Sequence, residues 1–225
     1  MPMPIDYPAK VSDLLEHADT YHRQFYQKQT FFGPSLHFHR RSLQASKAGD
    51  LEPCLELVYA TLTSWGMHRM GKGGAKMKPF EEFVGSVYPL APQIEQARSL
   101  NASAMREQDW QLLHSIFIAT DVMATQTKLV GNSKVMAHLI PNVVPPIDRE
   151  YTLKFLTGNK NIKNNLDAEW KWMREIIENL FIPVARDGAF QQLTDQWMTD
   201  QTRHPWDTSI FKVIDNLIIG RAVAS

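Results

Sequence analysis

Lys134, His138 and Asp148 are the side chains of this sequence whose types and spacing best fit a reactive site. A lysine with a lowered pKa is an amine nucleophile that forms Schiff bases, and a fixed carboxylate activates water or takes a proton from an amine. Lys134 and His138 are four residues apart, so they share one face of a helix. Pro145 and Pro146 stiffen the chain just before Asp148. These residues predict a site in which Asp148 and Lys134 are catalytic and His138 contacts the substrate.

Each of these side chains also has a structural interpretation. Asp148 is a good N-cap, because its carboxylate can accept the first free amides of a helix that continues through Leu156. An exposed lysine more often contacts water or phosphate than it acts as a nucleophile. An interior histidine more often has satisfied ring nitrogens than a catalytic role. Both interpretations stay open for all three residues.

The elements that must position these residues meet at Gly131. Gly131 and Asn132 can adopt positive φ at low cost, so we predict a tight turn between two helices there. Ser133 would then cap the second helix. The predicted buried face of that helix is Val135, Met136, Leu139 and Ile140. A proline-rich loop follows and delivers Asp148 to the start of a third helix, which completes an element of about residues 122–156.

This order of helix, glycine-centred hairpin, helix and proline-rich loop ending in Asp148 resembles the layout of helix-hairpin-helix DNA glycosylases. In that superfamily the hairpin amides hold a DNA phosphate, which implies substrate-binding roles for Gly131, Asn132 and Ser133. The resemblance also implies acid/base chemistry at Asp148 and, if one hairpin residue is missing, a nucleophilic amine at Lys134. Ser133 stands where a second hairpin glycine is usual, and the interval to Asp148 is shorter than in typical members.

Residues 66–78 are the most basic passage and contain no acidic residue. We expect a flexible loop in which backbone amides, Arg69 and Lys72 contact DNA phosphate. Gly66 and Lys72 also match the spacing of a nucleotide-binding P-loop, although Gly73 occupies the position of the Ser or Thr that holds magnesium. The passage is therefore a phosphate contact, a nucleotide site or a solvated surface loop.

The charge balance argues against a strongly basic nucleic-acid binder. The 225 residues carry 24 Lys and Arg against 24 Asp and Glu, so only local patches can attract phosphate. Cys54 is the only cysteine, which excludes a disulfide framework, a cysteine zinc site and an iron–sulfur cluster. His37 and His39 would share a face only on a strand, and we expect a helix there, with both side chains solvated. We predict no metal ion and no cofactor.

Helical periodicity recurs along the chain, and no run of β-branched residues is long enough to suggest a strand. We predict an all-α fold in a single helical domain over residues 1–225, and the resemblance adds two lobes that meet at the hairpin. The clearest expected helices cover about 11–25, 50–65, 110–124, 133–140, 148–156, 170–181 and 210–218. Pro183 is expected to end or kink the helix before it.

No apolar run approaches the length of a membrane span, and Met1-Pro2-Met3-Pro4 opens into a polar stretch rather than a signal peptide. We therefore expect a cytoplasmic protein without a membrane partner. The expected function is that of a glycosylase-like protein that binds duplex DNA and excises a base. The alternative is a non-catalytic interaction or nucleic-acid-binding protein that retains the fold, which the zero net charge and the altered hairpin favour. A third class is a phosphate-ligand or nucleotide-binding enzyme that uses residues 66–78.

Overall fold

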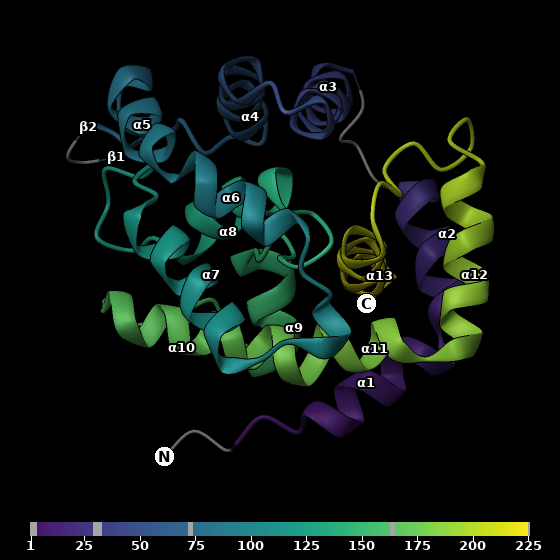
Figure 1. The fold of residues 1–225 in the computed structure, drawn as a ribbon. Coiled ribbons are helices and arrows are strands. Elements are labelled where there is room, and N and C mark those ends of the chain that lie inside the picture. The colour runs from purple at the N-terminus through teal and green to yellow at the C-terminus, as the bar shows by residue number, and fades with distance from the viewer. Residues whose placement is uncertain (1–3, 29–32, 72–73, 163–164, 225) are drawn as a thin grey trace.

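The predicted helical stripes form helices in the computed structural model, which describes residues 4–28, 33–71, 74–162 and 165–224 (Figure 1). The first helices are α1 (Tyr7–Glu16), α2 (Ala18–Lys28), α3 (Pro34–Ala48), α4 (Leu51–Ser64), α5 (Phe80–Val87), α6 (Ala91–Arg98) and α7 (Glu107–Ala119). They are followed by α8 (Leu129–Leu139), α9 (Lys154–Thr157), α10 (Leu166–Ile176), α11 (Ile182–Arg186), α12 (Gly188–Thr199) and α13 (Ile210–Ala224). The prediction of an all-α fold is confirmed.

Shorter elements connect these helices. Two are 3₁₀ turns, η1 (Tyr88–Leu90) and η2 (Ala102–Ala104), and two are single π-helical segments, η3 (Arg149–Leu153) and η4 (Ile177–Phe181). Within the described ranges, paired strands occur only in β1 (Met70–Gly71) and β2 (Gly74–Ala75), which are antiparallel. These two-residue strands are too short to form a separate layer of the fold.

The first helix begins earlier than predicted and is divided in two. Asp6 caps α1, because its carboxylate accepts the amide proton of Ala9 at 3.1 Å, and Pro8 occupies the first turn. At His17 the backbone leaves the helical region, with φ −116° and ψ 17°, and α2 begins at the next residue. The two helices therefore run in different directions (Figure 1).

Helix α13 packs closely against α2. Gly220 permits this approach, because a Cβ atom there would lie 1.9 Å from the backbone oxygen of Tyr21. On α13 the predicted apolar residues Phe211, Ile214 and Leu217 are buried. The pairing brings a helix from each end of the described chain together.

The helix before Pro183 does not end there. The residues of η4 form the π-helical segment after α10, and α11 then begins with Pro183 in its first turn. The backbone stays in the right-handed helical region across the junction, at both Phe181 and Ile182. The path therefore continues from α10 into α11 as one helical run.

The turn predicted at Gly131 and Asn132 is wrong. Both residues lie inside α8, and the described glycines with positive φ are at other positions in the chain. Gly131 is needed for space, because a Cβ atom there would lie 2.4 Å from Cγ of Met123. The Asn132 amide donates to the carbonyls of Phe117 and Thr120, at 2.8 and 2.7 Å, so it satisfies the end of α7. The connection between the two helices is instead the loop of residues 120–128.

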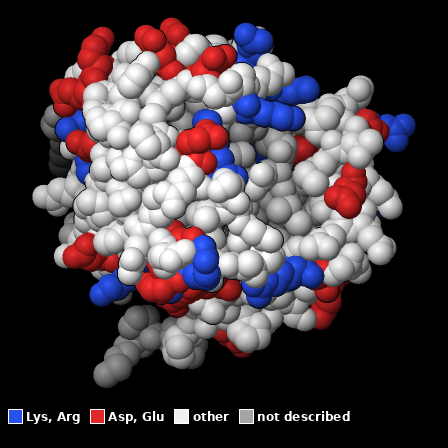
Figure 2. Space-filling model, viewed as in Figure 1, with Lys and Arg blue, Asp and Glu red and all other residues white. Residues whose placement is uncertain are grey.

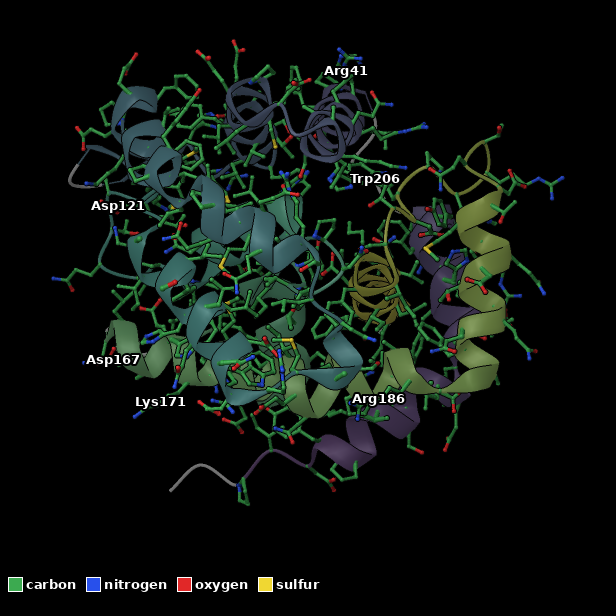
Figure 3. The ribbon with its side chains drawn as sticks, in the orientation of Figure 1. Arg41, Asp121, Asp167, Lys171, Arg186 and Trp206 are labelled. Atoms are coloured by element: carbon green, nitrogen blue, oxygen red, sulfur yellow. The ribbon has the colours of Figure 1, made fainter. Side chains whose placement is uncertain are left out.

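One apolar cluster joins residues from α1 to α13, and a small second cluster of Phe25, Trp206 and Ile219 lies beside it. In Figure 3, Trp206 lies inside between α3 and α13, whereas Arg41 and Lys171 project outward. None of the helices in the described ranges has both the length and the apolar content needed to cross a membrane.

Candidate functional site

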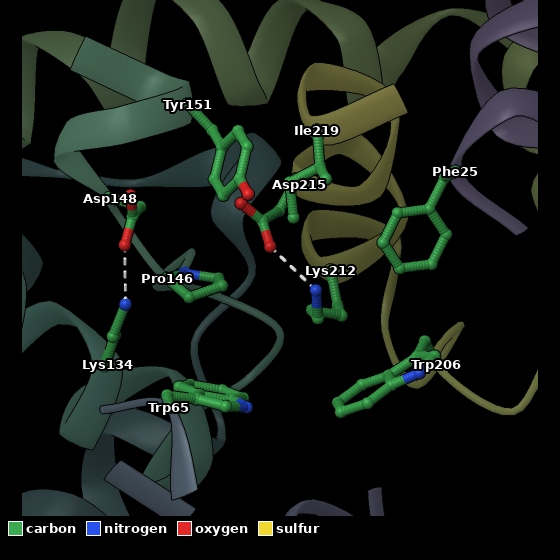
Figure 4. Close-up of a pocket in the computed structure, with 10 residues that line it drawn as sticks. All are labelled: Phe25, Trp65, Lys134, Pro146, Asp148, Tyr151, Trp206, Lys212, Asp215 and Ile219. Carbon is green, nitrogen blue, oxygen red and sulfur yellow. Dashed lines mark hydrogen bonds and ion pairs between the residues drawn. The ribbon is translucent and has the colours of Figure 1, made fainter. Parts of the chain in front are cut away.

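A cavity of about 90 Å³ opens where α8, η3 and α13 converge (Figure 4). Two lysines and two carboxylates line it, namely Lys134 from α8, Asp148 from the loop before η3, and Lys212 and Asp215 from α13. Four aromatic rings form much of the remaining wall, namely Phe25, Trp65, Tyr151 and Trp206. The cavity thus combines opposite charges with flat apolar surfaces.

Lys134 and Asp148, the residues predicted to be catalytic, meet in this cavity. The Lys134 Nζ atom donates to Asp148 Oδ2 at 2.7 Å, and only 8% of Lys134 is exposed. The other carboxylate oxygen, Oδ1, accepts the amide proton of Glu150 at 2.7 Å, so Asp148 also caps η3. Asp148 therefore caps a helix, as its structural interpretation predicted, and its carboxylate also lines the cavity beside Lys134.

Ser133 holds the proline-rich loop against α8, which fixes the approach to Asp148. Its hydroxyl oxygen accepts the amide proton of Ile147 at 3.1 Å and donates to the Val130 carbonyl at 3.2 Å. Ser133 is therefore not the N-cap that the sequence suggested. It positions Asp148 by bonding the neighbouring residue in the chain.

A second ion pair faces the first across the cavity and was missed by the sequence analysis. Lys212 Nζ donates to Asp215 Oδ2 at 2.7 Å and to Asn216 Oδ1 at 2.6 Å, and all three side chains are buried. Their spacing of three and four residues places them on one face of α13. The available signal was the presence of three polar residues within an otherwise apolar helix, between Ile210 and Ile219.

The aromatic rings lie close to both lysines. Lys134 Nζ is 5.3 Å from the centre of the Trp65 ring, and Lys212 Nζ is 5.7 Å from the centres of Phe25 and Trp206. These distances are within the range of cation–π attraction. The same ring faces offer stacking surfaces for a flat ligand.

Burial favours a higher pKa at both carboxyl groups in the cavity, but neighbouring groups reverse this effect at Asp148 and not at Asp215. At Asp148 the charge and hydrogen bond of Lys134, together with backbone amides, outweigh burial and leave the pKa below its usual value. At Asp215 burial outweighs the neighbouring Lys212, and the Asp148 charge adds to the effect, so the pKa lies above its usual value. Such a separation suits a base and an acid in one site, with Asp148 as the base.

His138 is a buried structural residue rather than a group that faces the cavity. Its Nδ1 atom lies 2.7 Å from the Lys134 carbonyl, which can only accept, so Nδ1 carries the proton. Its Nε2 atom therefore accepts from His39 Nδ1 at 2.9 Å, and His39 Nε2 accepts from the Thr208 hydroxyl at 3.1 Å. Both ring nitrogens of His138 are occupied within the protein.

His39 also differs from the prediction of a solvated pair. The passage is helical as expected, and His37 is exposed, but only 4% of His39 is exposed. The helix places these residues on different faces, and the face of His39 packs on α8.

The free amides at the start of α8 are occupied by a carboxylate of the protein itself. Glu169 Oε2 accepts the amide protons of Lys128 and Leu129 at 2.8 and 2.5 Å. These are free amides of the helix start, where a phosphate would otherwise bind. The resemblance implied a phosphate contact at Gly131, Asn132 and Ser133, but these three residues lie within the first turns of α8 and are buried.

The described residues of the basic passage, 66–71 and 74–78, are absent from the cavity lining. Arg69 is exposed and lies over Gly66, where an added Cβ would be 3.2 Å from Arg69 Nε. Lys72 lies outside the described residues. A P-loop runs from a strand into a helix, whereas here α4 precedes the passage and β1 pairs antiparallel with β2, so the flanking elements differ from those of a P-loop.

The visible surface carries mixed charges. Figure 2 shows Lys and Arg interspersed with Asp and Glu, and basic side chains gather over α3, which carries Arg40, Arg41 and Lys47. This distribution agrees with the zero net charge and provides a local rather than an extended basic patch.

No known protein family, no curated protein and no solved structure matches this chain. None of these comparisons supports the resemblance to helix-hairpin-helix glycosylases, and the turn that the resemblance centres on Gly131 is replaced by the continuous helix α8.

Proposed function

We propose that this protein binds nucleic acid with one nucleotide extruded into the cavity and cleaves the bond between its base and its sugar. The observation that carries the proposal is the 2.7 Å pair of Lys134 and Asp148 on the wall of an aromatic-lined cavity. Enzymes that act on a base in a duplex must take it out of the stack, and they hold it between aromatic or apolar side chains. Trp65 and Trp206 offer such faces beside the charged pair.

The chemistry follows from the two ion pairs. Asp148 takes a proton from the Lys134 ammonium as the amine attacks C1′ of the sugar, so a new carbon–nitrogen bond forms. The bond from C1′ to the base breaks, and its electron pair leaves with the base. The leaving base takes a proton that passes from the Lys212 ammonium through Asp215, which lies 2.7 Å from Lys212 Nζ and whose raised pKa favours accepting it. The adduct on Lys134 then opens to a Schiff base.

Borohydride trapping tests this sequence of steps. Damaged and mismatched duplex oligonucleotides are incubated with the protein and borohydride, which reduces the Schiff base to a stable covalent adduct. We expect trapping by the unchanged protein, none with Lys134→Ala, and a rate about 10²–10⁴-fold lower with Asp148→Asn, because a general base is removed. Lys171→Ala is the matched control, because this lysine is exposed and far from the cavity lining.

Trapping that survives Lys134→Ala would move the nucleophile to another amine. Base release without trapping would replace the amine by a water that Asp148 activates. In both cases the cavity keeps its role as the base-binding site.

A second candidate is a non-catalytic interaction or nucleic-acid-binding protein, which the zero net charge favours. The Glu169 carboxylate occupies the amides at the start of α8, so this helix start is not available to a phosphate of a substrate. The absence of base release and of trapping on every substrate in the screen, together with retained binding of single-stranded or flipped nucleotides, would support this candidate over the enzyme.

A further inference from the structure

Three side chains from distant parts of the sequence form a cluster outside the lining of the cavity. They are His22 from α2, and His204 and Asp207 from the loop between α12 and α13. One potential ligand atom from each residue lies within 4.8 Å of the others. Only 4% of His22 and 1% of Asp207 are exposed, so two of the three ligands are withdrawn from water.

The cluster has the parts that a metal site needs beyond its ligands. The Asp207 Oδ1 atom accepts from the Tyr26 hydroxyl at 3.0 Å and from the Asn216 amide at 2.8 Å, which leaves Oδ2 directed at His22. The His22 ring is fixed by stacking on Trp197, with ring centres 3.8 Å apart and planes 7° apart. Such outer contacts orient carboxylate and imidazole ligands in metal proteins.

His204 supplies the observation that points to a cation. Its Nδ1 atom is buried and has no hydrogen-bond partner. A buried nitrogen without a partner costs free energy, and a metal ion would satisfy its lone pair. Because His204 itself is only partly buried, its side also gives an ion access to the cluster.

We propose that His22, His204 and Asp207 bind a divalent transition-metal ion, with zinc as the preferred ion. Two imidazoles and one carboxylate suit zinc, which takes three protein ligands and an open fourth position in many sites. Zinc bonds of about 2.0–2.1 Å hold neighbouring ligand atoms roughly 3.4 Å apart. The ion would take the place of the hydrogen between His22 Nε2 and Asp207 Oδ2, which are now 2.7 Å apart.

This site would also fix one wall of the cavity, although it does not depend on the proposed function. Asn216 donates to Asp207 and accepts from Lys212 at 2.6 Å, so it joins the proposed ligand to a cavity lysine. The bound ion would therefore hold the loop of Trp206 and the start of α13 against α2.

Metal analysis of the tag-free protein tests the proposal. The protein is stripped with a chelator, exposed to zinc chloride and desalted, and the zinc content and the affinity by competition with a chromophoric chelator are measured. We expect one zinc ion per chain and an affinity at least about 100-fold weaker in His204→Gln and Asp207→Asn, because each loses a ligand. Cobalt in place of zinc should give the visible absorption bands of a four-coordinate site, and these should be lost in both variants.

His37→Gln is the matched control, because His37 is exposed and lies outside the cluster. It should keep both the stoichiometry and the affinity within twofold. Far-ultraviolet circular dichroism checks that each variant is folded, and His204→Gln is the milder change because this residue is only partly buried. Zinc content near zero in the unchanged protein, or binding that both ligand variants retain, would overturn the proposal.

Discussion

The stability of this protein should fall between pH 7 and pH 5 because of His138. Burial lowers the pKa of this histidine most strongly, the Lys134 carbonyl opposes that effect, and the charges of Lys212 and Lys134 add to it, with a net pKa of about 4 against 6.5 in the unfolded chain. The folded protein therefore binds fewer protons than the unfolded chain in this range. This contribution to stability is complete above pH 6.5 and is lost as the pH falls toward 4.

The magnitude follows from the difference of the two pKa values. Each pKa unit corresponds to about 1.36 kcal/mol, so the full effect of His138 is about 3.4 kcal/mol. Between pH 7 and pH 5 the expected loss is about 2 kcal/mol, because part of the titration lies below pH 5. The total stability of a domain is commonly about 5–15 kcal/mol, so this loss is large enough to measure.

Urea unfolding at pH 7, 6 and 5, followed by circular dichroism, gives the free energy of unfolding at each pH. His138→Gln removes the titrating ring, so the stability of the variant lacks this pH dependence. The difference in the free energy of unfolding between the variant and the unchanged protein, whatever its size at pH 7, should therefore be smaller by about 2 kcal/mol at pH 5. The exposed His37 is the control, and His37→Gln should leave the gap constant. A gap for His138→Gln that is equal at pH 7 and pH 5 would refute the reasoning, since His138 would then not be held neutral by the fold.

Three further predictions follow from the packing and the surface. Gly220→Ala should lower the free energy of unfolding by about 3 kcal/mol, because its Cβ would meet the Tyr21 backbone. Gly85→Ala, on an open helical surface, should instead raise the free energy of unfolding by up to about 1 kcal/mol. Urea unfolding of both variants measures the two changes. Asn132→Leu should lower the free energy of unfolding by about 1–3 kcal/mol in the same assay, because two carbonyls at the end of α7 lose their donor. Asn179 is exposed, and Asn179→Leu should change the free energy of unfolding by less than about 0.5 kcal/mol. Binding to duplex DNA should have a shallow salt dependence, because acidic and basic residues are equal in number and few basic side chains can contact phosphate. Fluorescence anisotropy at several salt concentrations should give a slope of log affinity against log salt of about −3 or shallower, and a steeper slope would require a larger contact.

Local signals in the sequence were sufficient for most of the helices and for placing Lys134 and Asp148 in one candidate site, but not for their ion pair. The spacing of Lys134 within a helix and the proline-rich run before Asp148 act over a few residues, and the structure brings these two side chains together at 2.7 Å. The apolar periodicity of α13 likewise predicted its buried face. Such patterns report the element in which a residue lies.

The errors arose where a residue type has more than one physical use. Gly131 suggested positive φ, but its lack of a side chain serves a close approach of Met123. Asn132 suggested a turn, but its amide satisfies the end of another helix. His22 and Asp207 are 185 positions apart, so no local pattern could pair them. The choice in each case depends on contacts that only the folded chain defines.

The position of the cavity walls has a consequence for the order in which this protein can mature during synthesis. Phe25 comes from α2 near the start of the chain, whereas Lys212 and Ile219 come from α13. A ribosome that has released only the first two hundred residues has produced the Lys134–Asp148 pair but not the helix that faces it. Contacts between such distant segments form slowly, since a long loop must close first. The nascent chain therefore exposes Phe25 and the α13-facing side of α2 until α13 has been synthesised, and the cavity is completed only when α13 docks.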